Sequence, residues 1–330
     1  MEKPQNTAPR NYQKELVDIY HQGIVQLAKN PQTSVADIHA NLIALAQEGL
    51  AVYPNNAFLH SHLAWILNET GDLEGAIRHL KIAARLAPDD CHYLSTLAYV
   101  LCRSERYEEA LEILKSITDK DNARISDMNL YGYALIMAGN LEEAEKVLRT
   151  VVAYGPSSLT YVANYRYATG QLPQGGLPVD PYEASYLPQI ADYARRKFLS
   201  NEPKEDLPQE HWQFVLPIVE KKLAESPDDA ALQFSRAIVL NGLGRYAEAL
   251  PVFQAGRRVW LPSVEPANYE QLAIALNGLG RYQEALEIIR EALSIYGDHD
   301  GLKKGFQDQA DIARKALAAV RPDAPKNAGP

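Results

Sequence analysis

The sequence is poor in cysteine, and this limits the covalent cross-links that can stabilise it. Among 330 residues only two are cysteines, Cys91 and Cys102. If one helix carries both, a rise of about 1.5 Å per residue places them roughly 16 Å apart, too far for a disulfide. Free thiols fit a reducing compartment, and we therefore expect a cytoplasmic protein.

Runs of basic residues and long apolar runs are also missing. The chain carries 33 Lys and Arg against 42 Asp and Glu, a formal net charge of -9. Because proteins bind a phosphate backbone through clustered Lys and Arg, we expect no nucleic-acid partner. No stretch approaches the roughly 18 uninterrupted apolar residues that span a bilayer, and residues 1–20 lack the apolar segment of a signal peptide. We therefore expect no membrane partner.

One residue pattern recurs at a fixed interval. Segments starting at Ala57, Cys91 and Ile125 follow one another by 34 residues. Small residues let two helices approach closely, a glycine permits the turn between them, and a proline ends the second helix. Each segment therefore predicts a helix hairpin. The matching positions are 8 (Ala64, Ala98, Gly132), 15 (Gly71, Gly139), 20 (Ala76, Ala110, Ala144) and 32 (Pro88, Pro156).

Two more segments, starting at Ala230 and Pro266, carry the same pattern. Their starts lie 36 residues apart, because the loop 259–265 adds two residues. In register they have Ala237 and Ala273 at position 8, Gly244 and Gly280 at position 15, and Ala249 and Ala285 at position 20.

This recurrence resembles the tetratricopeptide repeat family, because the whole pattern returns in register rather than as a single motif. The resemblance implies an all-α fold, an α-solenoid of helix hairpins wound into a right-handed superhelix. It also implies that the first helix of each hairpin lines a concave groove that binds a protein or peptide.

The chain divides into repeats and atypical segments. We expect a disordered tail over 1–10, a degenerate helix pair over 11–56 (helices at 12–28 and 35–52), three repeats over 57–158, interrupted repeats over 159–229, two repeats over 230–300, a capping helix over 301–320 and a disordered tail over 321–330.

The regular interval breaks inside the fourth repeat. Its first helix begins at Leu159, but the irregular loop 170–181 then contains three glycines and three prolines, which cannot propagate a helix. Helical patterns follow over 182–200 and 206–226. Their pairing is left open by the sequence.

Several apparent chemical motifs belong to the repeat itself. The glycines of NGLGRYA, 241–247, lie in the turn after a helix, whereas a dinucleotide site needs a preceding strand. Glu108 and Glu109 fall in the first turn of a second helix, where they offset its dipole. His60 and His62 lie about 200° apart around a helix and cannot share a metal ion. We therefore expect no enzyme activity, no cofactor and no metal.

The resemblance places positions 2, 5, 9, 12 and 13 of each repeat on the groove wall. Position 9 carries an aromatic residue in four successive repeats, and we call these four the aromatic ladder: Trp65, Tyr99, Tyr133 and Tyr167. The other candidate partner-binding residues are Ser61, Asn68, Ser95 and Asn129 in the early repeats and Phe234, Ile238, Asn241, Glu270, Ile274 and Asn277 in the later ones.

The ladder suggests the shape of a ligand. Packed helices lie about 8 to 10 Å apart, and a polyproline II segment advances about 9.3 Å per three-residue turn. An extended or Pro-containing segment could thus place one residue in three against successive rings. The family's clamp for acidic C-terminal tails uses Lys and Asn side chains. Here the groove positions carry Ser, Trp and Tyr, and Arg103 is the only cation among them in the first three repeats, which disfavours such a clamp.

We therefore expect a non-catalytic adaptor or scaffold that binds a protein segment in its groove. A peptide-sensing regulator and an accessory subunit of an enzyme complex remain as alternatives. The rings could instead pack on neighbouring helices. A second hypothesis is that the loop 170–181, or a Pro-containing tail, itself occupies the groove as an internal plug.

Overall fold

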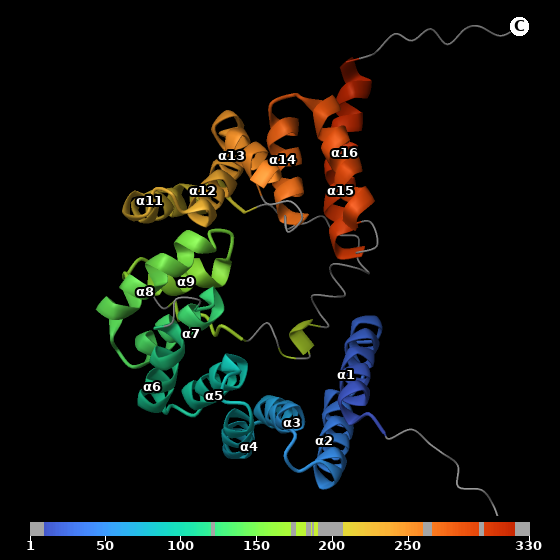
Figure 1. Ribbon diagram of the computed structural model, residues 1–330, viewed down its shortest axis with the longest axis vertical. Helices are drawn as coiled ribbons and strands as arrows, with labels where there is room; N and C mark the ends of the chain where they lie inside the picture. The colour runs from blue at the N-terminus through green and yellow to red at the C-terminus, as the bar shows by residue number, and fades with distance from the viewer. Residues whose placement is uncertain are drawn as a thin grey trace, which may run out of the picture. The chain divides into compact units, whose positions relative to one another are not determined.

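The computed structural model describes residues 10–119, 123–172, 176–182, 186, 188–190, 207–259, 266–296 and 300–320. Within these ranges the chain is helical and contains no strand, which confirms the expected all-α fold (Figure 1). The tails expected over 1–10 and 321–330 lie almost wholly outside the described residues, as does most of the helical pattern over 182–200.

The first helix of each repeat begins at the residue from which that repeat was counted. These helices are α3 (Ala57–Thr70), α5 (Cys91–Arg103), α7 (Ile125–Met137), α9 (Leu159–Ala168), α12 (Ala230–Gly242) and α14 (Pro266–Gly278). The second helices are α4 (Leu73–Leu86), α6 (Tyr107–Thr118), α8 (Leu141–Tyr154), α13 (Tyr246–Val259) and α15 (Tyr282–Tyr296). Outside the regular repeats lie α1 (Tyr12–Lys29), α2 (Val35–Val52), α11 (Gln209–Glu225) and α16 (Asp300–Val320).

Contacts divide the chain into two compact units. Compact unit 1 comprises Met1–Val151 and Ala163–Glu205, and compact unit 2 comprises Val152–Val162 and Asp206–Pro330. The boundaries fall near the end of α8, inside α9 and shortly before α11. Each unit is described below by itself.

Local chemistry explains where the helices start and turn. Side chains accept hydrogen bonds from first-turn amides, as when Asp72 Oδ1 accepts from Gly75 N at 2.9 Å. The turn between the helices of a repeat needs a positive φ, which Gly71 adopts at 91° and Gly139 at 82°. In the second repeat the same position is Glu105, held at φ 59°.

Close packing within a hairpin depends on the small residues at position 8. Ala64 and Ala98 are fully buried. At Gly132 an added Cβ would lie only 2.5 Å from Leu148 Cδ2 of the paired helix. The second helix therefore approaches as closely as the pattern of small residues predicts.

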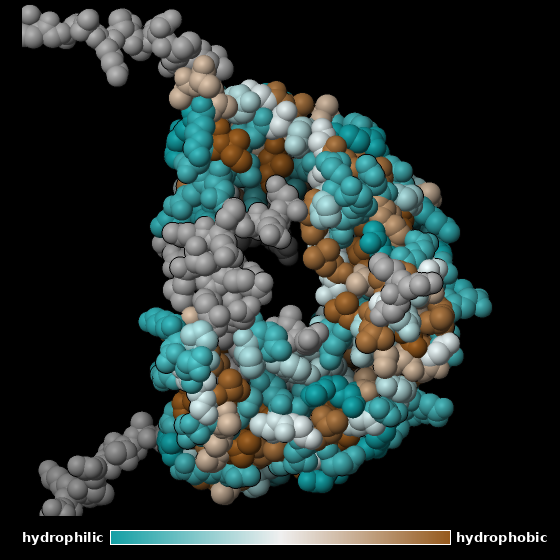
Figure 2. All heavy atoms as spheres, turned by 180° about the vertical axis from the view of Figure 1, so that it is seen from behind, coloured by the Kyte–Doolittle hydropathy of each residue, from teal (hydrophilic) through white to brown (hydrophobic). Residues whose placement is uncertain are grey.

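In compact unit 1 the helices follow one another along an arc, with α3, α5 and α7 on its inner side and α4 and α6 outside (Figure 1). In the view of Figure 2, hydrophilic residues cover much of the surface, and hydrophobic residues show as patches among them. No helix among the described residues is long and apolar enough to span a membrane.

In compact unit 2 a core around Phe253, Tyr269 and Phe306 joins α12 to α16. Helix α16 takes the place of a further first helix. Asn277 of α14 donates to the backbone and side-chain oxygens of Gln309, both at 3.0 Å, just as Asn241 of α12 donates to those of Gln271. The contact that links successive repeats therefore also attaches α16.

Candidate functional site

Three rungs of the aromatic ladder contact one hydrophobic cluster in compact unit 1. Trp65 on α3 and Tyr133 on α7 are half-buried, whereas Tyr99 on α5 is fully buried. The ring centroids of Trp65 and Tyr99 lie 6.2 Å apart. Tyr167 on α9 is half-buried, and the described residues show no ring contact between it and the other three.

Tyr99 is covered by residues from the segment that follows α9. We call Gly176–Tyr182 together with Tyr186 the insertion segment; in Figure 1 part of it runs on the inner side of unit 1. The Tyr182 ring lies 4.6 Å from that of Tyr99 and 6.2 Å from that of Trp65. The Tyr186 ring lies 5.8 Å from Trp65. The ladder is thus neither bare nor packed only on neighbouring helices, because two tyrosines of the insertion segment lie against it.

Within the described part of the chain, the Tyr99 hydroxyl forms its hydrogen bonds with the insertion segment. It donates to Asp180 Oδ2 at 3.0 Å, and the Tyr186 hydroxyl lies within hydrogen-bond reach of it. Burial raises the pKa of Tyr99, and the contacts with Tyr186 and the carboxylate of Asp180 raise it further. The hydroxyl therefore keeps its proton at neutral pH and can donate it to the carboxylate.

A second side chain bonds the backbone of the insertion segment. Asn164 on α9 is fully buried. Its Oδ1 accepts from Val179 N at 2.7 Å, and its Nδ2 donates to Val179 O at 3.0 Å. Both backbone groups of one residue are therefore paired by one amide, a contact that does not depend on the identity of the Val179 side chain.

Two arginines border the same surface. The Arg103 guanidinium lies 5.4 Å from the centre of the Tyr186 ring and donates to Asn68 O and Oδ1 at 2.7 and 2.8 Å. Arg124 bonds Asp127, and this hydrogen bond raises the pKa of the Arg124 guanidinium. Both cations are thus already paired with groups of the repeats.

The polar residues predicted for the groove wall in unit 1 are buried between consecutive first helices. Ser61, Asn68, Ser95 and Asn129 are each no more than 5 % exposed. Ser95 Oγ donates to Asp127 Oδ1 at 2.7 Å, and Asn68 accepts from Arg103 of the next repeat. Such bonds connect one repeat with the next.

The residues predicted in unit 2 form a separate surface on α12 and α14. Phe234, Ile238, Glu270 and Ile274 are half-buried, and the Phe234 ring lies edge-on at 5.5 Å from that of Phe253. Asn241 and Asn277 are buried and bonded to the following helix, as described above. Of these two, Asn241 contacts the next repeat and Asn277 contacts α16.

Sequence reasoning missed the residues of the insertion segment and Asn164. The signal for them was present in part, because the sequence suggested that the loop 170–181 occupies the groove. Its contacts at Val179 and Asp180 agree with that hypothesis. Tyr182 and Tyr186 follow directly after that loop and were assigned to a helix instead.

Elsewhere in the described part of the chain, few residues are suited to catalysis or to metal binding. Among the described residues no group of three or more His, Cys, Asp or Glu could hold a metal ion. Burial, and to a lesser extent the charge of Asp180, raise the pKa of the Cys102 thiol to about 12, so it is not a nucleophile at neutral pH. His60 and His79 bond one another through their Nδ1 atoms at 2.8 Å, and His60 Nε2 bonds Pro54 O.

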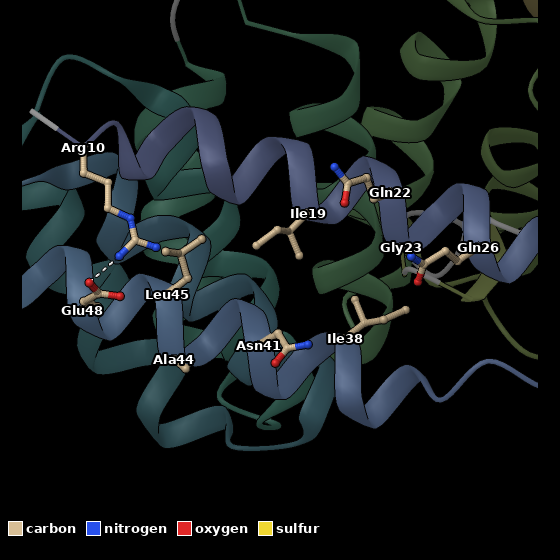
Figure 3. A pocket seen from close by; sticks show the side chains of 10 residues that line it. All are labelled: Arg10, Ile19, Gln22, Gly23, Gln26, Ile38, Asn41, Ala44, Leu45 and Glu48. Carbon is tan, nitrogen blue, oxygen red and sulfur yellow. Dashed lines mark hydrogen bonds and ion pairs between the residues drawn. The ribbon is translucent and has the colours of Figure 1, made fainter. Parts of the chain in front are cut away.

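A pocket of about 440 Å³ lies between α1 and α2, away from the ladder (Figure 3). Arg10 and Glu48 pair with each other at one end of it, and neutral side chains such as Gln22 and Asn41 line the rest. It presents no unpaired charge and no nucleophile, so it does not compete with the ladder as a candidate site.

Comparisons with family models match three parts of the chain. Residues 69–151 match the model described as anaphase-promoting complex, cyclosome, subunit 3, and residues 230–255 and 269–298 match tetratricopeptide repeat models. A comparison with curated proteins gives no match.

Solved structures of tetratricopeptide repeat proteins also resemble the chain at low identity. One from Parabacteroides merdae is 13 % identical, with a TM-score of 0.39, over 92 % of this chain and 99 % of that chain. The complex of the TPR2AB domain of yeast Sti1 with pHSP90 is 18 % identical, with a TM-score of 0.31, over 78 % and 98 %. YrrB, a TPR protein with an unusual peptide-binding site, is 13 % identical, with a TM-score of 0.27, over 79 % and 97 %.

Stacked helix hairpins with the same inter-repeat contacts define an α-solenoid repeat protein. Within that class, the chain carries tetratricopeptide-type repeats, in agreement with the family models matched over 69–151, 230–255 and 269–298. Proteins of this family generally act as non-catalytic adaptors, and the fold indicates a scaffold for protein–protein interaction.

Proposed function

We propose that the chain is a non-catalytic adaptor whose first helices in compact unit 1 bind a non-helical segment of a partner protein. One observation carries this proposal: Asn164 pairs both backbone groups of Val179. A buried amide that bonds a peptide backbone in this way, beside a row of rings, is suited to holding a peptide whatever its sequence at that point.

The rings supply the remaining contact area. Trp65, Tyr99 and Tyr133 offer large apolar faces with polar tips, and such residues are favoured anchors at interfaces. The Tyr99 hydroxyl adds a donor for a carboxylate. The buried polar residues Ser95 and Asn129 hold the first helices in register beneath this surface.

A second contact area is proposed on compact unit 2, formed by Phe234, Ile238, Glu270 and Ile274. Its chemistry differs from that of the ladder, because it carries two aliphatic side chains and a carboxylate beside a single aromatic ring. It would therefore suit a different part of a partner.

A peptide-sensing regulator is the second candidate. The observation that favours it is the insertion segment itself, since a site that already holds a peptide of its own chain can respond to another peptide by releasing it.

A peptide library displayed on phage tests the adaptor function. The bait is the full chain with residues 176–186 replaced by a Gly/Ser linker of the same length, which leaves the ladder accessible. Selected peptides are then titrated against Tyr133→Ala in this background, and we expect at least a tenfold loss of affinity.

Tyr131→Ala is the matched control. Tyr131 lies on the same helix, is also half-buried, and points toward Glu143 of the second helix at 3.5 Å. Its loss is expected to leave peptide affinity unchanged. If no peptide is selected, or if both variants lose affinity equally, the ladder is not a peptide site.

A further inference from the structure

The insertion segment lies against the ladder in the way a bound peptide would. Its backbone is paired by Asn164 at Val179, its carboxylate is bonded by Tyr99, and the Tyr182 ring lies against those of Tyr99 and Trp65. Asp180 Oδ1 also accepts from Tyr182 N at 2.8 Å, which fixes the angle between the two recognised side chains.

The segment is also preorganised by its own sequence. Pro178 and Pro181 fix their φ angles, and each biases the residue before it, Leu177 and Asp180, away from the helical region. Less conformational entropy is therefore lost when the segment docks than with a flexible linker.

Filling the hydrophobic core of compact unit 1 explains little of the contact between the insertion segment and the ladder. The Tyr182 and Tyr186 rings are only half-buried, and Leu177 is 78 % exposed. The segment carries proline and glycine, which are unsuited to a repeat helix, yet it supplies hydrogen-bond partners for two fully buried side chains, Tyr99 and Asn164. This is the composition of a ligand rather than of a structural helix.

Resting on the proposed function, we propose that residues 177–182, together with Tyr186, are a ligand in cis. The site recognises an acidic residue followed two positions later by tyrosine, and a partner segment of the same chemistry binds by displacing the chain's own copy. Asp180 and Tyr182 supply this pair, and the Tyr186 ring adds a second aromatic contact beneath the Arg103 cation.

The insertion segment competes strongly with a free peptide because it is tethered to the same chain. A short tether gives an effective concentration on the order of millimolar. For a free peptide with a Kd near 0.1 mM, occupation in cis would therefore weaken apparent binding roughly tenfold or more.

The test uses a fluorescein-labelled peptide of residues 177–186, LPVDPYEASY, and measures anisotropy. The full chain with residues 176–186 replaced by a Gly/Ser linker is expected to bind it saturably, and the wild-type chain at least tenfold more weakly. A scrambled peptide is the control. If the replaced chain does not give the wild-type helical circular dichroism spectrum, the double variant Asp180→Asn/Tyr182→Leu of the full chain replaces it.

A double-mutant cycle tests the recognised chemistry. Tyr99→Phe in the linker-replaced chain is expected to weaken its binding of the wild-type peptide at least fivefold. The same change is expected to weaken binding of the Asp180→Asn peptide less than twofold. Equal binding to wild-type and replaced chains, no saturable binding to a folded replaced chain, or equal loss for both peptides would each overturn the inference. If library peptides bind through Tyr133 while LPVDPYEASY does not, this inference fails and the adaptor function stands; if neither binds, both fail.

Discussion

Replacing Asn164 by alanine should loosen the insertion segment without damaging the repeats. Two hydrogen bonds to Val179, at 2.7 and 3.0 Å, disappear in this variant. A typical intramolecular hydrogen bond contributes about 0.5–1.5 kcal/mol, so the free energy of unfolding should fall by about 1–3 kcal/mol. Asn164→Asp should cost at least as much as alanine, because it loses the donor and sets a buried carboxylate oxygen against Val179 O.

The measurement is a double-mutant cycle in urea. Asn164→Ala is made in the wild-type chain and in the chain whose residues 176–186 are a Gly/Ser linker. Because the bonds to Val179 exist only in the first, the linker background should lose no more than about 0.5 kcal/mol, the usual limit of additivity. The weak contact of Asn164 with Asn129, at 3.5 Å, is present in both backgrounds and cancels. Equal losses in the two backgrounds would refute the docking of Val179 on Asn164.

Three further predictions concern the repeats. Glu105→Gly should raise the free energy of unfolding by about 1 kcal/mol, because Glu105 holds a positive φ at a position where the other described repeats have glycine. Urea unfolding at constant m-value measures this change, and a loss of stability would contradict the prediction. Gly132→Val should cost about 1–3 kcal/mol by the same assay, since an added Cβ meets Leu148, and an unchanged midpoint would show that the helices separate easily. Burial lowers the pKa of His79, and the neighbouring His60 lowers it further. The neutral His79 ring therefore contributes stability that is complete above about pH 6.5 and is lost as the pH falls through the lowered pKa of the folded state. The urea midpoint should therefore fall less steeply between pH 7.5 and pH 5 in His79→Gln than in wild type, and identical slopes would refute the assignment.

The sequence was sufficient for the fold because the fold is periodic. The first helices α3, α5, α7 and α9 start at the 34-residue interval, since proline, cap and glycine act over a few residues. Glu105 shows the limit: the sequence departs from glycine there, but the backbone still adopts the positive φ that the hairpin imposes.

The candidate site was predictable only where it follows the same interval. Trp65, Tyr99 and Tyr133 were found through position 9, whereas Asp180 reaches Tyr99 from 81 residues away, through a loop whose path no period determines. Asn68 and Ser95 share the positions of groove residues, but their partners Arg103 and Asp127 come from the next repeat, which buries them. Side-chain partners across repeats have no signature in a single sequence.

Contact between Tyr182 and the ladder is the most direct test of the whole account. In the wild-type chain with selectively labelled aromatic residues, nuclear Overhauser effects are expected between the rings of Tyr182 and Tyr99, whose centroids lie 4.6 Å apart. Adding excess LPVDPYEASY peptide should reduce them as the segment is displaced. A folded protein without these effects would contradict the claim that the ladder holds a peptide of its own chain.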